Sequence, residues 1–218
     1  MRTNPFDDTW QFFLANQPDQ LARGEARWLL LGLFLALLAG SLVIAVINWR
    51  DDPDQRTLPH LVTWLARVLV GSMWFQGSLW KLPLFTTDNG LFYWTQQMVQ
   101  HSAFDWHRDL VAHAVIPAFL VIGPLVYLTE LAFAASLILG FAVRLTGLIG
   151  VAFVINLWIG LYRHPGEWPW NYVFLALLMG AFSLHAAGRS LGLDALLRRR
   201  MLQWTRRTPW EQVLAGVS

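Results

Sequence analysis

The stretch LTELAFAASLILGFAVR, residues 128–144, decides the fold because it places one carboxylate, Glu130, inside a long apolar run. With its flanking residues the run is long enough to be a membrane span, since about 20 apolar residues cross a bilayer. An ionisable side chain at that depth is costly. It usually faces the bundle interior, finds a polar partner and marks a site of proton, ion or ligand handling. A polar partner for Glu130 is therefore expected on one of the other helices.

Composition places the chain in a membrane. Of its 218 residues, 56% are hydrophobic and 14% are charged, which is typical of integral membrane proteins. Long unbroken apolar runs favour helices over a barrel, so we expect an all-α integral membrane protein. The net charge of +2 is too small to indicate nucleic acid as a partner. Because the chain has no cysteine, redox chemistry would need a bound organic cofactor, a haem or another subunit.

Hydropathy predicts five transmembrane helices. The first contains no ionisable residue, so we expect it to serve packing or anchoring rather than chemistry. The third is unusually long, and Pro117 and Pro124 should bend it. A tight turn at residues 140–144 would make the third and fourth spans antiparallel neighbours. The five spans are residues 28–49, 62–83, 114–143, 145–162 and 171–187.

Three segments lie outside the spans. Residues 1–27 form a polar arm, either ordered on the membrane or a partner, or frayed. Residues 84–112 form a loop on the outer face, with a short interfacial helix around 91–98. Residues 189–218 form a basic, amphipathic tail, with an interfacial helix at 193–204. Five spans put the termini on opposite sides. Ten of the 16 Lys and Arg residues, Arg67 among them, would share the side of the C-terminus, which predicts a cytoplasmic C-terminus.

Two amides fall at about the depth of Glu130. Gln76 in the second span and Asn156 in the fourth lie roughly as far from the cytoplasmic side, at about 1.5 Å of rise per residue. A protonatable acid beside two amides suits a quinone, whose carbonyls need a hydrogen-bond donor and, on reduction, a proton source. The alternative is a structural cross-link, in which protonated Glu130 bonds Gln76 or Asn156.

A second group of polar and aromatic side chains is predicted at the outer face. Its cations among aromatic rings could receive an anionic substrate or a quinone headgroup; the alternative is an ordinary interfacial belt. His113 and His164 would lie near the outer ends of adjacent spans, but they have no recognisable ligand spacing, so we expect no haem and no metal. The proposed members of the group are Trp80 for the quinone, and Lys81, Arg163, His164, Trp168 and Trp170 for the substrate.

Residues 62–198 resemble the DoxX/DoxD family, of which DoxD is known as the membrane subunit of thiosulfate:quinone oxidoreductase. The resemblance implies a four-helix transmembrane bundle, here residues 62–188, with a glutamate in the third span that falls on Glu130. It also implies electron transfer from thiosulfate to a membrane quinone, forming tetrathionate. The first span, residues 28–49, would be an additional N-terminal helix. The resemblance rests on RVLVGSMWFQGSLWKLP (67–83), TELAFAASLILGFAVRLTGLIG (129–150), EWPWNY (167–172) and GRSLGLDALL (188–197).

These features together predict a quinone-interacting subunit of an oxidoreductase in a bacterial or archaeal inner membrane. Glu130 would donate or accept a proton, Gln76 and Asn156 would orient the quinone, and Lys81, Arg163 and His164 would meet an anionic electron donor. Membrane lipids and other protein subunits are the expected partners. The rival hypothesis is a non-catalytic accessory subunit of a larger respiratory or photosynthetic complex, in which the uncharged first span and the amphipathic ends serve as docking surfaces.

Overall fold

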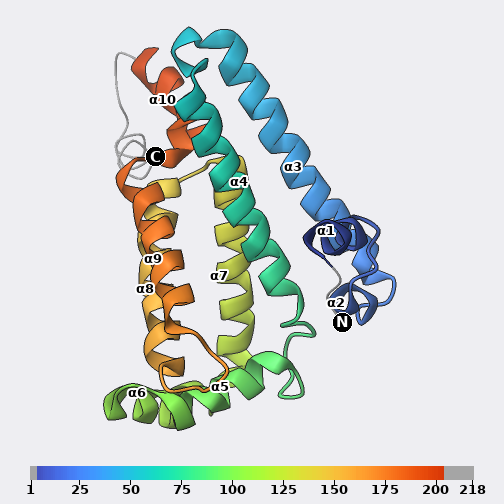
Figure 1. Cartoon of the computed structure of the whole chain (residues 1–218), viewed down its shortest axis with the longest axis vertical. Helices are drawn as coiled ribbons and strands as arrows, with labels where there is room; N and C mark the ends of the chain where they lie inside the picture. The colour runs from blue at the N-terminus through green and yellow to red at the C-terminus, as the bar shows by residue number, and fades with distance from the viewer. Residues whose placement is uncertain (1–3, 204–218) are drawn as a thin grey trace.

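Helices make up all of the regular secondary structure that the structure, a computed structural model, describes between residues 4 and 203. The long helices run alongside one another (Figure 1), which confirms the all-α fold class. A hairpin of α8 and α9 lies on one side of α7, and α4 and α3 lie on the other, where both contact α7. The five helices are α3 (Ala26–Asp51), α4 (Leu58–Leu79), α7 (Phe119–Leu139), α8 (Val143–Leu161) and α9 (Pro169–Leu184).

Three of the five helices, α3, α7 and α8, are long and apolar enough to cross a membrane. The 22-residue α4 has the length but not the hydropathy, because it carries polar side chains such as Arg67 and Gln76. The apolar α9 has only 16 residues, somewhat fewer than the roughly 20 of a usual span. The chain is therefore a multi-pass membrane protein in which two of the predicted spans fall short of the usual criteria.

The third predicted span is shorter than expected. It was placed at residues 114–143, but α7 begins at Phe119 and ends at Leu139. Before it, α6 (Asp105–Leu110) runs into a π-helical turn, η2 (Val111–Val115). Pro117 falls in the break, where its ring and missing N–H prevent a continuous helix. At the other end, Gly140 has φ +72° and closes α7 in a left-handed conformation.

Short helices cover both ends of the bundle (Figure 1). At one end α5 (Gly90–His101) and α6 lie across the long helices, and α5 includes the helix predicted at 91–98. At the opposite end α10 (Leu193–Gln203) forms where a helix was predicted, close to η1 (Pro53–Gln55) and η3 (Ala187–Arg189). The rest of the predicted tail, residues 204–218, lies outside the described part of the chain.

The N-terminal arm folds against its own chain rather than fraying. It forms α1 (Pro5–Phe13) and α2 (Pro18–Leu21) beside the first half of α3. The Phe12 ring packs edge-on against Phe34 of α3, with centroids 5.1 Å apart. Gln20 is buried and donates from Nε2 to the Phe12 carbonyl at 3.0 Å. Burial of Phe12 and the satisfied amide together hold the arm in place.

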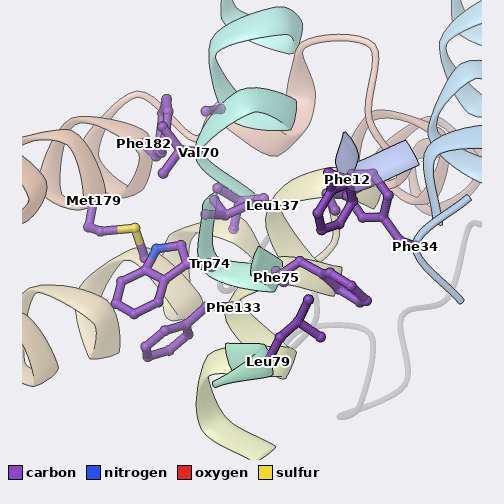
Figure 2. Close-up of a cluster of buried hydrophobic side chains, with 14 of the residues drawn as sticks. Phe12, Phe34, Val70, Trp74, Phe75, Leu79, Phe133, Leu137, Met179 and Phe182 are labelled. Carbon is purple, nitrogen blue, oxygen red and sulfur yellow. The ribbon is translucent and has the colours of Figure 1, made fainter. Parts of the chain in front are cut away.

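An aromatic and aliphatic core joins α4 to its neighbours (Figure 2). Trp74 of α4 packs on Phe133 of α7, with centroids 5.1 Å apart. One turn earlier, Gly71 lets α4 approach α7 so closely that a Cβ there would collide with Leu137 and Ile138. Because α4 and α7 run in opposite directions, moving two turns along both helices from this crossing leads to the end of α4 on one and to Glu130 on the other.

Candidate functional site

Glu130 pairs with a lysine rather than with an amide. Lys81 Nζ lies 2.6 Å from Glu130 Oε2, and the two side chains are only 6% and 5% exposed. The pair joins α7 to the segment that follows α4. Lys81 was predicted at the outer interface, but it lies buried beside Glu130. The lysine supplies the polar partner that an acid inside a membrane bundle requires.

The end of α4 explains why Lys81 turns inward. The helix stops at Leu79, and the chain makes a tight turn in which the Lys81 N–H donates to the Ser78 carbonyl at 3.2 Å. The lysine side chain then reaches back along the helix, where Nζ donates to the Gly77 carbonyl at 2.7 Å. The last carbonyls of a helix lack intrahelical partners and attract cations, so the end of α4 stabilises the ammonium.

The Trp80 ring is the third neighbour of the Lys81 ammonium, after Glu130 and the Gly77 carbonyl. Lys81 Nζ lies 4.2 Å from the centroid of the Trp80 ring, in position for a cation–π interaction. That ring is held against the start of α5, where a Cβ on Gly90 would come within 3.1 Å of it. Asn89 caps α5 by accepting from the Phe92 N–H and donates from Nδ2 to the Lys81 carbonyl at 2.9 Å. The lateral helix α5 therefore fixes the backbone that carries Lys81.

The arrangement can accept or release a proton inside the bundle. A buried ion pair loses much of its Coulombic attraction to the cost of desolvating both charges, so it is a poor device for stability alone. Oε2 lies 2.6 Å from the Lys81 ammonium, and Oε1 accepts no hydrogen bond from the described residues, so Oε1 can take a further one. Lys81 supplies a donor and a positive charge beside that oxygen. Two titratable groups with opposed charge in one buried site are suited to acid–base chemistry.

The two amides predicted to join Glu130 lie elsewhere, so the depth match did not bring the three together. Gln76 is exposed in the isolated chain and donates to Gln17 Oε1 of the N-terminal arm at 2.9 Å. Asn156 is also exposed, and its Oδ1 lies 3.1 Å from Nε2 of His107. Depth along a helix says nothing about the rotation of that helix, and each amide faces a different neighbour.

The partner of Asn156 is a buried histidine that the sequence did not single out. His107 is 2% exposed, and its Nδ1 lies 2.9 Å from Ser102 Oγ. The same connection is fixed by a backbone bond from Ala103 to the Ile159 carbonyl at 2.8 Å. These contacts attach α5 and α6 to α8. His107 lies in the polar stretch 105–109, where hydropathy predicts an exposed side chain rather than a buried one.

The other residues predicted for the outer face surround the turn between α8 and α9. Arg163 donates from Nη2 to the Ala103 carbonyl at 3.1 Å and remains exposed. The His164 ring packs against Trp94 and His101, with centroids 5.0 and 4.8 Å away. Trp168 and Trp170 are 60% and 57% exposed. Trp80 and Lys81 instead belong to the Glu130 site, so the predicted group divides into two.

A family model for DoxD, described as the TQO small subunit, matches residues 62–215, which is more than half of the chain. The chain belongs to the DoxD family. The match begins within α4 and leaves the N-terminal arm and α3 outside. No curated protein and no solved structure matched the chain.

Two segments that carry the DoxD resemblance meet at the end of the bundle opposite Lys81. Arg67 of α4 is fully buried and donates from Nη1 to the Leu137 carbonyl and from Nη2 to the Ser190 carbonyl, the latter at 3.4 Å. A side chain on Gly140 would collide with its guanidinium. Arg67 was counted among the charges on the side of the C-terminus, and it lies at that end of the bundle, but it is buried between helices rather than exposed. Its position four residues before Gly71 places it on the face of α4 that packs against α7.

Asp194 organises the same end of the DoxD bundle. Its carboxylate accepts from the Ala142 and Val143 N–H groups at 2.8 and 3.2 Å, which caps the start of α8. Its own N–H donates to the Gly140 carbonyl at 2.8 Å. Burial raises the pKa of the Asp194 carboxyl, whereas the two N–H donors and Arg67 oppose that rise. Residues 188–194 thereby fasten α4, α7 and α8 together.

Proposed function

We propose that this chain is the quinone-interacting membrane subunit of a thiosulfate:quinone oxidoreductase-like complex, with the Lys81–Glu130 pair as its proton-handling site. Membership of the DoxD family supports a membrane subunit of such a complex. The observation that carries the proposal is the buried contact of 2.6 Å between Lys81 Nζ and Glu130 Oε2. A charged pair that contributes little net stability is best explained by chemistry.

The donor set at the pair fits a quinone. A bound quinone would take two electrons and two protons to become a quinol, while two thiosulfate ions lose those electrons and join through a new S–S bond as tetrathionate. Glu130 would hold and deliver a proton through Oε1. Lys81 would place positive charge where negative charge develops on a carbonyl oxygen. The Trp80 ring, 4.2 Å from Nζ, would keep the ammonium in that position.

Electrons would enter from the end of the bundle that carries α5 and α6. There Arg163 is exposed beside the His164 ring and offers a cation to a dianion such as thiosulfate, or to the partner subunit that holds it. The opposite end would face the cytoplasm of a bacterium or archaeon, because α10 places Arg198, Arg199 and Arg200 there.

The experiment removes the pair in two ways and measures thiosulfate-dependent reduction of a short-chain quinone in membranes that contain the complex. Glu130→Gln should lower the rate by about 10²- to 10⁴-fold, the usual contribution of a general acid. The double variant Glu130→Leu/Lys81→Met leaves no buried unpaired charge, so it should fold and be equally inactive. Wild-type rates in the folded double variant would contradict the proposal.

One observation favours an accessory role as the second candidate. The pair, with Asn89 behind it, also links α4, α5 and α7, which is what a scaffold subunit would need at the end of its bundle. In that case the double variant would support quinone reduction at the wild-type rate. Loss of the partner subunits from Glu130→Leu alone, together with their retention by the double variant, would establish the structural role.

A further inference from the structure

Two histidines lie where the end of α5 meets the turn between α8 and α9. The His101 and His164 rings are nearly perpendicular, with centroids 4.8 Å apart. Trp94 of α5 also packs on His164, with centroids 5.0 Å apart. Both imidazoles are half-buried. Histidine is the side chain whose charge changes near neutral pH, so this end of the bundle can carry a positive charge that depends on pH.

Arg163 is fixed beside the histidine pair. Its backbone N–H donates to the His101 carbonyl at 3.0 Å, and its Nη2 donates to the Ala103 carbonyl at 3.1 Å. The side chain is exposed, and other N–H groups of the guanidinium remain for a ligand. In the part of the chain that the structure describes, no carboxylate forms an ion pair with Arg163 or with either histidine. These side chains can therefore bind an anion from solution.

The hydrogen bonds of the pair decide which ring takes up a proton. His164 Nδ1 accepts from the Gly166 N–H at 3.1 Å, so a proton on that nitrogen would break the bond. The neutral His164 ring therefore keeps its hydrogen on Nε2. The His101 ring makes no hydrogen bond with any described residue. Two charged rings in contact would repel each other, so the pair holds one proton, on His101.

The carboxylates near the pair are already engaged. On α6, Asp105 and Asp109 both pair with Arg108. In the turn, Glu167 accepts from the Tyr172 hydroxyl at 2.8 Å. A proton on His101 is therefore best neutralised by a bound anion. The other titratable groups on the adjoining elements are His107, which bonds Ser102 and Asn156, and His113, whose Nδ1 lies 2.9 Å from the Asp109 carbonyl oxygen.

We propose that Arg163 and His101 form a proton-linked binding site for a small dianion. The dianion binds the guanidinium of Arg163, and a proton from water moves onto His101, whose new N–H donates to the anion. His164 holds the His101 ring in place by edge-to-face packing. On the proposed function, on which this site rests, the dianion is the electron donor thiosulfate. Binding of the donor consumes a proton and therefore weakens as the pH rises.

The test titrates the full-length protein, in nanodiscs without quinone, with thiosulfate in an isothermal calorimeter. At about pH 7.5, where a histidine in water is mostly neutral, two buffers with different ionisation enthalpies give the number of protons taken up. The wild type should take up most of one proton per anion. Its affinity should fall by up to about tenfold for each further pH unit, the limit for one linked proton. Absence of binding, or binding without proton uptake, would overturn the proposal.

The absence of quinone separates this site from the Lys81–Glu130 chemistry. Proton-linked binding by a complex that does not reduce quinone would support the anion site and contradict the proposed function. Thiosulfate-dependent quinone reduction without proton uptake on binding would support the proposed function and refute the role of His101.

Two variants and a matched control assign the proton. His101→Gln should bind thiosulfate about tenfold more weakly at acidic pH and take up no proton, because it loses a charge-assisted hydrogen bond. His101→Lys supplies a permanent charge, so at about pH 7.5 it should bind as tightly as the protonated wild type, again without proton uptake. His113→Gln removes an exposed histidine of η2 at the same end and should keep the wild-type uptake. Undiminished uptake in His101→Gln would overturn the assignment.

Discussion

Lys81 and Glu130 neutralise each other at the end of α4, with less than a tenth of either side chain exposed. Removing only one of them leaves a buried charge without its partner, whereas removing both does not. We therefore expect Glu130→Leu to lower the free energy of unfolding by about 3–5 kcal/mol. The double variant Glu130→Leu/Lys81→Met should lie within about 1 kcal/mol of the wild type or above it. Thermal unfolding in detergent, followed by circular dichroism, measures both. Equal losses in the two variants would show that the pair is not coupled.

Gln76 and Asn156 should be dispensable for quinone reduction, although the sequence placed both beside Glu130. Gln76 bonds the N-terminal arm and Asn156 bonds His107, so neither faces the carboxylate. Gln76→Leu and Asn156→Leu should each keep the wild-type rate to within about twofold, because neither removes a group from the reacting site. A loss comparable to that of Glu130→Gln would mean that the quinone binds between these amides rather than at the pair.

Arg163 should govern the affinity for the electron donor. It is exposed at the end of the bundle that carries α5 and α6, and its bond to the Ala103 carbonyl leaves further N–H groups available. If thiosulfate binds there, Arg163→Gln should raise KM for thiosulfate several-fold, because it removes a charge-assisted hydrogen bond of about 1.5–3 kcal/mol. The kcat should change little. Arg56, an exposed arginine at the other end, is the matched control, and an equal effect of Arg56→Gln would point to net charge alone.

Gly140 should tolerate no side chain. Its φ of +72° costs a side chain about 1–2 kcal/mol, and a Cβ would also collide with Arg67 and Gly192. Gly140→Ala should therefore destabilise the protein strongly. Gly32→Ala in α3 serves as the control, because a Cβ there meets nothing within 4 Å and alanine favours the helix. Thermal unfolding should separate the two variants by several degrees, and identical midpoints would contradict the packing at this turn.

Much of the fold could be predicted because long apolar runs report helices directly. The sequence also located Glu130 and required a partner for it, since buried charge in a membrane needs one. The partner, Lys81, was predicted at the interface because the predicted second span ran as far as Pro83. The actual end at Leu79 turns the lysine inward.

Contacts between segments far apart in the chain escaped prediction for a different reason. Arg67 and His107 are polar residues in stretches where hydropathy expects a surface, and their burial depends on carbonyls and side chains up to 123 positions away. The rotation of each helix decides which neighbour a side chain meets. Periodicity alone did not distinguish the face of Gln76 from that of Trp74, which lies in the core two positions earlier.

The cap that Asp194 gives to α8 has a consequence for biosynthesis. A ribosome makes the start of α8 some 50 residues before it reaches this aspartate. Until then the first N–H groups of α8 lack their acceptor, and Arg67 lacks the Ser190 carbonyl. The helices therefore cannot complete their packing as they leave the translocon one by one. The final packing of the bundle waits for the last described helix, so a nascent chain truncated before residue 194 should be a substrate for quality-control proteases even though every long helix has been made.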